Sequence, residues 1–282
     1  MKYFTVDLYD YFGVERNGNA GGSLRVYLHE NYPELNMNRR YPAMLVLPGG
    51  GYAMVSEREA APIAERYFSY GYNAFILTYS VVPSRYPTQL VEAAMAMAYI
   101  RRNARSHFTD ADHVAAIGFS AGGHLCGSLA TMFADEVIGQ YVDLSAEEIR
   151  PSAAVLSYAV INPQEGLSGG TFSNLCGGND EILPLVTIDE RVTENTPPLF
   201  IWHTFNDGCV DVSNAIKIAA AARANNVPFA MHIFGSGQHG LSTADGDVYS
   251  TAAMPQNVSK GVENWLKMSI DWLAENGFGY KE

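Results

Sequence analysis

Short apolar runs of strand length alternate along this chain with longer segments of helical period, and this alternation constrains the fold more than any other feature. Because strands that alternate with helices build parallel sheets, the pattern predicts the α/β class, with helices on both faces of a mostly parallel sheet. Tyr3–Leu8 and Ser23–Leu28 instead alternate polar with apolar residues, as an antiparallel pair at a sheet edge would. The buried strands are expected at Ala43–Leu47, Ala74–Tyr79, Val114–Phe119, Ala153–Val160, Leu199–Phe205 and Phe229–Phe234.

The helical segments fall between these strands. They are expected at Glu57–Tyr70, Pro87–Ala104, Ala121–Phe133, Val212–Asn225 and Val258–Glu275. Two long stretches, Asn162–Pro198 and Gly235–Pro255, do not fit the alternation. Loops this long are usually functional or disordered, and loops at the carboxyl ends of parallel strands wall the active site. We therefore expect residues 1–282 to form one domain in which 162–198 is an insertion that lines the active site, with a solvated insertion as the alternative.

A sharp turn between a strand and a helix contains the candidate nucleophile. Gly118-Phe119-Ser120-Ala121-Gly122 fits the pattern G-x-S-x-G, follows an apolar strand and opens a small-residue helix. Such a turn lifts the serine hydroxyl above the sheet edge, and its glycines leave room where strand and helix crowd. The pattern also occurs around Ser168, but polar residues precede that serine and no helical pattern follows it. Ser120 is therefore the expected nucleophile.

The candidate general base is a histidine, because a serine hydroxyl is a poor nucleophile until an imidazole removes its proton. In folds with this turn, the acid follows the serine and the histidine comes last. His239 lies in a glycine-flanked loop after the last strand and fits that order. His232 lies inside that strand, whereas His124 and His203 are expected to be structural. The chain order therefore favours His239.

The acid is expected after the penultimate strand, where Asp207 stands. Its carboxylate would accept the imidazole Nδ1 proton and stabilise the imidazolium. Asp211, four residues further on, is the alternative, although a cap of the helix that begins near Val212 is the more natural role for it. Asp245 and Asp247 follow the histidine and break the order.

A glycine-rich turn, Pro48-Gly49-Gly50-Gly51-Tyr52, follows the first parallel strand. In this architecture that turn supplies amide donors to the substrate oxygen, so the backbone N–H groups of Gly50, Gly51 and Ala121 are the expected oxyanion hole. A phosphate-binding loop is the alternative, but the turn lacks both the G-x-G-x-x-G spacing and the P-loop lysine.

Together these motifs resemble the hormone-sensitive-lipase-like and acetyl-xylan-esterase-like carboxylesterases of the α/β-hydrolase superfamily. The resemblance implies an eight-stranded, mostly parallel sheet, no metal or organic cofactor, and Ser120, Asp207 and His239 as the triad. Pro48 stands where lipase-like members have histidine, so this turn looks more like that of bacterial sugar-acetyl esterases. The motifs that carry the resemblance are Leu47–Tyr52, Ser56–Ala60, Gly118–Leu125, Trp202–Val210 and Gly237–Ser242.

Charge and composition narrow the partners and the compartment. A net charge of −12 repels phosphate backbones and anionic lipids, which argues against nucleic acid as a partner. No apolar run is long enough for a membrane span, and Met1–Asp10 lacks the apolar core of a signal peptide. The three cysteines form no CxxC pair, as is typical of reduced thiols in a cytoplasm. We therefore expect a cytoplasmic protein.

These features predict a serine esterase that hydrolyses short-chain esters, in particular acetyl esters of imported oligosaccharides, through an acyl-enzyme. Tyr52, beside the glycine turn, is the expected substrate contact. A lipase is the first alternative, although 162–198 is too polar and glycine-rich for a broad apolar lid. A non-catalytic binding protein on the same scaffold is the second, although such proteins commonly lose a triad member. The sequence leaves open which sugar is bound and whether the chain forms a homo-oligomer.

Overall fold

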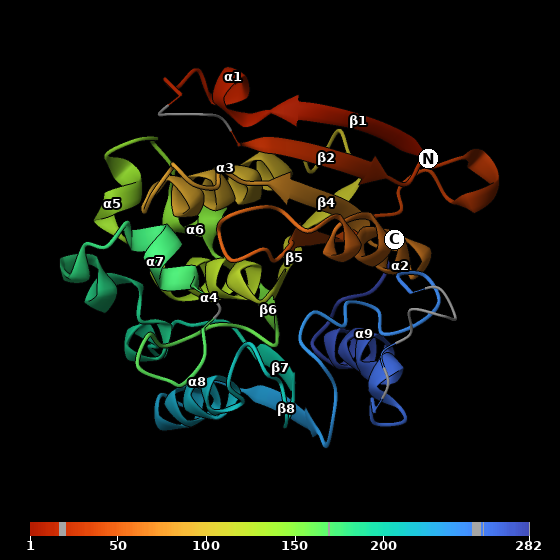
Figure 1. Ribbon diagram of the computed structural model, residues 1–282. Helices are drawn as coiled ribbons and strands as arrows, with labels where there is room; N and C mark the ends of the chain where they lie inside the picture. The colour runs from red at the N-terminus through yellow and green to blue at the C-terminus, as the bar shows by residue number, and fades with distance from the viewer. Residues whose placement is uncertain (17–20, 169, 250–254, 256, 282) are drawn as a thin grey trace.

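One sheet of eight strands organises the protein. The computed structural model describes residues 1–16, 21–168, 170–249, 255 and 257–281. The strands follow one another across the sheet in the order β1-β2-β4-β3-β5-β6-β7-β8 (Figure 1). Their bounds are β1 Lys2–Asp7, β2 Ser23–Leu28, β3 Tyr41–Leu47, β4 Asn73–Thr78, β5 Thr109–Phe119, β6 Ala153–Ser157, β7 Leu199–Thr204 and β8 Phe229–Phe234.

The sheet is mostly parallel, as the sequence predicts. Strand β2 pairs antiparallel with both β1 and β4, so the polar–apolar alternation of the first two strands does mark an antiparallel edge. All pairs from β4 to β8 are parallel. Because both faces of a parallel sheet are covered, its central strands are apolar on both sides, and every residue of β3 is buried.

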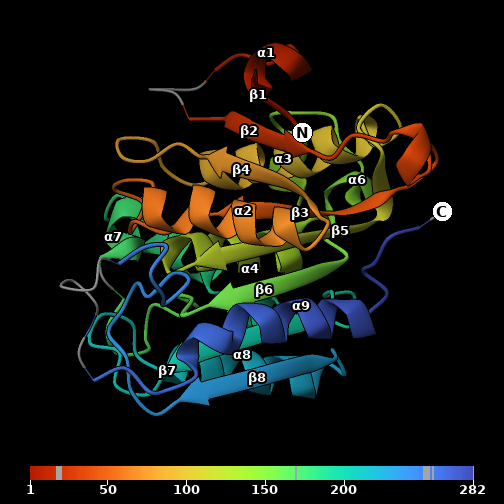
Figure 2. The ribbon, with the colours of Figure 1, turned by 90° about the vertical axis from the view of Figure 1, so that its right-hand side faces the viewer.

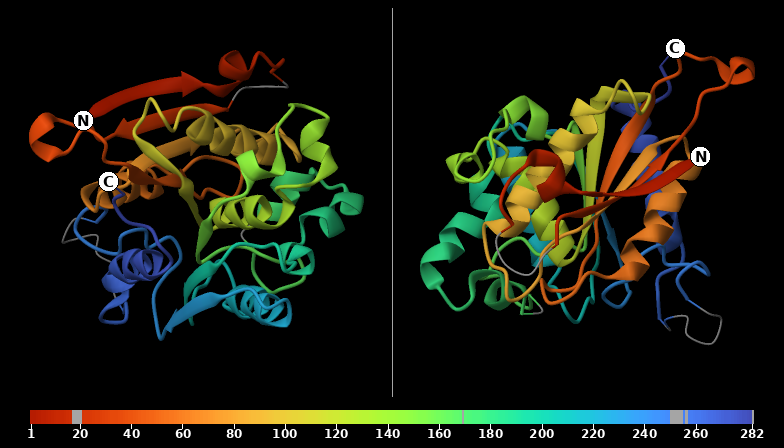
Figure 3. Two further views of the ribbon diagram at one scale, coloured as in Figure 1. Left: turned by 180° about the vertical axis from the view of Figure 1, so that it is seen from behind. Right: turned by 90° about the horizontal axis from the view of Figure 1, so that it is seen from above.

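Helices cover both faces of the sheet (Figures 2 and 3). On one face lie α2 (Ala61–Ser69) and α9 (Trp265–Glu275), and on the other α3 (Thr88–Arg102), α4 (Ala121–Met132) and α8 (Ser213–Ala224). Two buried clusters result, one on each face, and alternate residues of the strands belong to each. The short helices are α1 Leu8–Phe12, α5 Glu136–Gly139, α6 Ala146–Ile149 and α7 Thr171–Cys176, and the 3₁₀ helices are Pro33–Leu35, Glu57–Glu59, Asp180–Val186, Ile188–Arg191 and Val262–Asn264.

The structure corrects several expected boundaries. Strand β5 begins at Thr109 rather than Val114, because Thr109 pairs with Tyr41 at the start of β3 before a shift in register. Polar side chains hide the strand character of this segment. Strand β6 ends at Ser157 rather than Val160. The stretch 162–198 is no plain loop, since it contains α7 and two of the 3₁₀ helices. In the stretch 235–255, residues 250–254 lie outside the described residues.

No helix within the described part of the chain has both the length and the apolar composition that crossing a membrane requires.

Candidate active site

Ser120 occupies a strained turn between β5 and α4. Its φ of 54° and ψ of −119° place a non-glycine residue in the left-handed half of conformational space, at a cost on the order of 1–3 kcal/mol. The turn is also crowded, because a Cβ added at Gly122 would lie 2.2 Å from the carbonyl oxygens of Leu47 and Pro48. Glycine is therefore required for α4 to pack against the end of β3. The strain and the close packing fix the serine at the carboxyl edge of the sheet.

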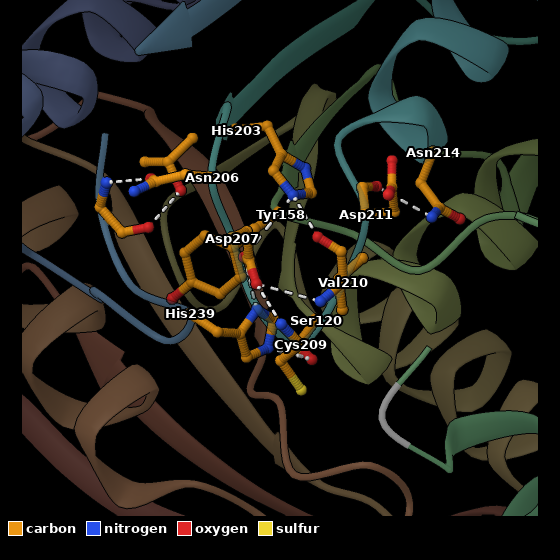
Figure 4. A network of polar contacts seen from close by, with 12 residues as sticks. Ser120, Tyr158, His203, Asn206, Asp207, Cys209, Val210, Asp211, Asn214 and His239 are labelled. Atoms are coloured by element: carbon orange, nitrogen blue, oxygen red, sulfur yellow. Dashed lines mark hydrogen bonds and ion pairs between the residues drawn. The ribbon is translucent and has the colours of Figure 1, made fainter. Parts of the chain in front are cut away.

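The structure brings the three candidate residues together from three separate loops (Figure 4). His239 Nε2 lies 2.8 Å from Ser120 Oγ, and His239 Nδ1 lies 2.7 Å from Asp207 Oδ2. Ser120 and Asp207 are 9% and 8% exposed, so both groups are largely shielded from solvent. In such a chain of contacts, the imidazole can accept the hydroxyl proton while the carboxylate accepts the Nδ1 proton.

Asp207 is surrounded by hydrogen-bond donors. Its Oδ1 accepts the backbone N–H groups of Cys209 and Val210 at 2.8 and 3.0 Å. Its Oδ2, besides contacting His239, lies 3.6 Å from Nε2 of the fully buried His203, which also lies 3.0 Å from the Val210 carbonyl oxygen. Burial raises the pKa of the Asp207 carboxyl, but the nearby His203 ring, the hydrogen bond from His239, the charge of His239 and the Val210 amide outweigh burial and hold that pKa well below its ordinary value. Asp207 is therefore a carboxylate at neutral pH.

The glycine turn after β3 presents two free amides. The carbonyl of Gly49 accepts the Ser56 N–H at 2.9 Å, and that of Gly50 accepts the Ala53 N–H at 3.0 Å. Because C=O and N–H point in opposite directions across a trans peptide, these bonds turn the N–H groups of Gly50 and Gly51 the other way. Among the described residues, neither the Gly50 N–H nor the Gly51 N–H donates a hydrogen bond to any acceptor.

Two further features complete this arrangement of donors. Ala121 is the first residue of α4, where a helix N–H has no intrahelical acceptor, so its amide is also available. Gly50 adopts a φ of 128°, and a Cβ there would lie 2.1 Å from the carbonyl oxygen of Met54. Only glycine can hold this turn in place.

A pocket of about 390 Å³ joins these groups. Ser120, His239, Gly50 and Gly51 line it. Thr171 and Asn174 of α7 also line it, and the Asn174 side chain donates to the Gly51 carbonyl at 2.8 Å. An adjoining hollow of about 320 Å³ shares His239 and is lined by Asn206, Cys209, Gln238 and Asn257.

Tyr52 is too buried to contact a molecule in the pocket, which corrects the expectation that it does. The residue is 1% exposed, and its hydroxyl contacts His124 Nδ1 at 2.9 Å. The other nitrogen of His124 lies 2.8 Å from the Val186 carbonyl oxygen, and burial lowers the pKa of this histidine to about 4. The position of Tyr52 beside the glycine turn predicts a side chain that faces the substrate, but the left-handed φ of 57° turns it into the core. Tyr52 therefore anchors the turn.

The alternative residues lie elsewhere. Ser168 forms a β-bridge with Val210 and lies at no strand–helix turn. Asp211 accepts the N–H of Ser213, the first residue of α8, and so orders the helix start. Within the described residues, no group of three or more His, Cys, Asp or Glu side chains is arranged to hold a metal ion.

Sequence reasoning missed Glu59 and Asn174, which both line the pocket. Glu59 is 3% exposed, and its Oε2 accepts the Gly49 N–H at 2.8 Å. The only signal in the sequence was that Glu59 belongs to the Ser56–Ala60 motif. Asn174 had no signal, because it lies in the stretch without periodicity.

Comparison with known proteins identifies the family. The BD-FAE family model matches residues 30–222. The chain is 36% identical over 237 residues to endo-1,4-beta-xylanase B of Butyrivibrio fibrisolvens, covering 81% of this chain and 36% of that protein. It is 26% identical over 233 residues to an acetylxylan esterase of Xylanibacter ruminicola, covering 80% of this chain and 45% of that protein. The chain therefore spans less than half the length of either relative.

A solved structure matches nearly the whole chain. The acetyl ester-xyloside bifunctional hydrolase of Caldicellulosiruptor lactoaceticus superposes with a TM-score of 0.82 at 28% identity, covering 98% of this chain and 97% of that one. Together with the strand order and the covered faces, this match shows the α/β-hydrolase fold. The extent of the family match and the 36% identity show that this chain belongs to the BD-FAE family.

Proposed function

We propose that this protein is a serine carboxylesterase in which Ser120, His239 and Asp207 act as a catalytic triad. The observation that carries the proposal is the pair of short contacts of His239, 2.8 Å to the serine oxygen and 2.7 Å to the carboxylate. The solved and curated relatives named as esterases support the same reaction class.

The geometry supports a two-step mechanism. Ser120 Oγ attacks the ester carbonyl while His239 Nε2 takes its proton, and the tetrahedral intermediate collapses as His239 returns that proton to the leaving alcohol. Water then attacks the acyl carbonyl while His239 takes its proton. His239 returns that proton to Ser120 Oγ as the bond between the acyl group and the serine breaks and the acid leaves. Asp207, already ionised, stabilises the imidazolium in both steps.

The amides of Gly50, Gly51 and Ala121 are proposed to hold the oxyanion. An oxyanion-hole donor typically contributes about 3 kcal/mol to the transition state, because it points at the oxygen before charge develops there.

We expect Gly50→Ala to lower kcat by about 10²- to 10³-fold, because the added Cβ displaces the turn that carries two of these donors. Gly178→Ala is the matched control: Gly178 also has a positive φ, 80°, but a Cβ added there would have no atom within 4 Å. Both variants are compared by steady-state kinetics on p-nitrophenyl acetate. Equal losses of kcat in the two variants would assign the effect to backbone strain in general.

The proposed substrate is a short-chain ester, acetyl above all, of an oligosaccharide. Two relatives are named for acetyl esters and one for xylan cleavage, which supports acetylated sugars as the substrate class. The hollow next to His239 adds support, because carboxamides such as those of Asn206, Gln238 and Asn257 both donate to and accept from sugar hydroxyls. We further propose that 162–198 is an insertion within one hydrolase domain and forms a pocket wall through α7.

We also propose that the protein acts in the cytoplasm. An oligosaccharide taken up by the cell would meet the enzyme in the cytoplasm, where Cys126, Cys176 and Cys209 would stay reduced. All three are free thiols, and none is paired with another.

A series of p-nitrophenyl esters from two to twelve carbons tests the acyl preference. We expect kcat/KM to peak at acetate and to fall at least about tenfold by eight carbons, a difference of about 1.4 kcal/mol in transition-state binding. A peak at eight carbons or more would instead indicate a lipase. Release of acetate from acetylated xylo-oligosaccharides, measured against the Ser120→Ala background, tests the sugar.

A further inference from the structure

Glu59 is a buried carboxylate between the two loops that flank Ser120. Its Oε2 accepts the Gly49 N–H at 2.8 Å, and its Oε1 accepts the Tyr158 hydroxyl at 2.7 Å. The Tyr158 oxygen in turn accepts the Ser242 N–H at 3.0 Å. One carboxylate therefore connects the turn before Gly50 with the loop that carries His239.

The contacts of Tyr158 extend this connection to the base itself. The tyrosine is 2% exposed, and its ring packs edge to face against the His239 imidazole with 5.1 Å between the ring centroids. Tyr158 is thus fixed at its hydroxyl by Glu59 and Ser242, and its ring limits where the imidazole can lie.

The chemistry at this position requires a carboxylate. Gly49 N–H and Tyr158 O–H both donate to this carboxylate, and the tyrosine oxygen accepts from the Ser242 N–H. A glutamine of the same size has one acceptor oxygen, so its NH₂ group would face a donor on one side. A buried donor that loses its acceptor lowers the stability of the fold by about 1–3 kcal/mol, and the group that carries it tends to shift.

We propose that Glu59 is a positioning residue that sets the distance between the oxyanion turn and the base-bearing loop. The proposal rests on the proposed esterase function. A misplacement of about 1 Å among reacting groups can cost on the order of 10² in rate, so loss of this carboxylate has a kinetic consequence although Glu59 does not react.

The test compares Glu59→Gln with Glu92→Gln. Glu92 is a matched control, because it is fully buried and its carboxylate also accepts several donors, namely Ser80 N–H, Ser80 Oγ–H and Tyr9 O–H. We expect both variants to lower the unfolding midpoint, whereas only Glu59→Gln lowers kcat on p-nitrophenyl acetate, by about 10²-fold with little change in KM.

Tyr158→Phe provides a second variant that keeps the ring against His239 and removes only the hydroxyl. We expect a smaller loss of kcat than in Glu59→Gln, and the double variant should be no slower than Glu59→Gln alone, because the two groups act as one unit. If Glu59→Gln does not fold, the comparison of Tyr158→Phe with Glu92→Gln tests the same link.

Amide hydrogen exchange gives a readout that does not depend on activity. We expect faster exchange in peptides covering 48–56 and 237–244 in Glu59→Gln and not in Glu92→Gln. If the wild-type protein showed no esterase activity, the proposed function would be refuted. Faster exchange of these peptides in Glu59→Gln would then still support the positioning role. A folded Glu59→Gln protein with kcat within threefold of wild type and unchanged exchange in both loops would overturn the inference.

Discussion

Ser120→Ala should lower kcat on p-nitrophenyl acetate by about 10⁴- to 10⁶-fold while the protein stays folded. The hydroxyl is the only group at the strained turn that can form the acyl-enzyme, and alanine removes it without adding volume. His239→Ala should cost about as much, because without the imidazole the serine keeps its proton.

The controls for this prediction come from the chain itself. Ser168→Ala changes the second G-x-S-x-G match, whose serine lies in a β-bridge to Val210, and should leave kcat unchanged. The double variant Ser120→Ala, His239→Ala should be no slower than either single variant, because residues that act as a unit lose their effect together. Retention of more than about a tenth of wild-type kcat in Ser120→Ala would exclude the triad.

The order of elements could be predicted because the parallel sheet has a simple sequence signature. The central strands are apolar over most of their length, so the parallel strands stood out between helical segments. The elbow serine was distinguishable from Ser168 by its neighbours alone. The start of β5 escaped prediction because Thr109 to His113 are mostly polar, and Thr109 meets its partner Tyr41 in β3 only in the folded sheet.

The site was predictable only where chain order restricts it. Asp207 and His239 could be proposed as neighbours of Ser120 because each follows an identifiable strand. The burial of Tyr52 depends on a backbone angle that no pattern of residues reveals, and no motif indicates that its hydroxyl contacts His124. Glu59 and Asn174 were missed for a similar reason, since each acts on the glycine turn through a contact with a single backbone group.

Asp207→Asn should lower kcat by about 10⁴-fold with little change in structure. The carboxylate accepts Nδ1–H of His239 and thereby leaves Nε2 free to take the serine proton. An asparagine can direct its NH₂ group at Nδ1, which places the imidazole proton on Nε2 and disables the base. The Cys209 and Val210 amides, which now bind Oδ1, favour this orientation because they keep the asparagine oxygen on their own side.

Asp211→Asn is the matched control for the acid. Its side chain accepts a helix N–H from Ser213, a role that asparagine also performs, so kcat should stay near wild type. If Asp211→Asn lost activity and Asp207→Asn kept it, the assignment of the acid would be wrong.

The pH dependence of stability provides an independent measurement of the same carboxylate. The folded-state pKa of Asp207 lies well below its unfolded value, so its ionised form adds stability that is fully present above about pH 4 and is lost as pH falls toward the folded pKa. Asp207→Asn lacks this term. Urea titrations measure the difference in unfolding free energy between wild type and variant, and this difference should therefore shrink as pH falls below about 4. For Asp211→Asn the same difference should change less with pH, because the Asp211 carboxylate is partnered only by one helix end. If the difference in unfolding free energy between wild type and Asp207→Asn stayed constant down to about pH 2, the carboxylate at 207 would not be held ionised by its two histidines and two amides. The electrostatic basis of the proposed triad would then fail.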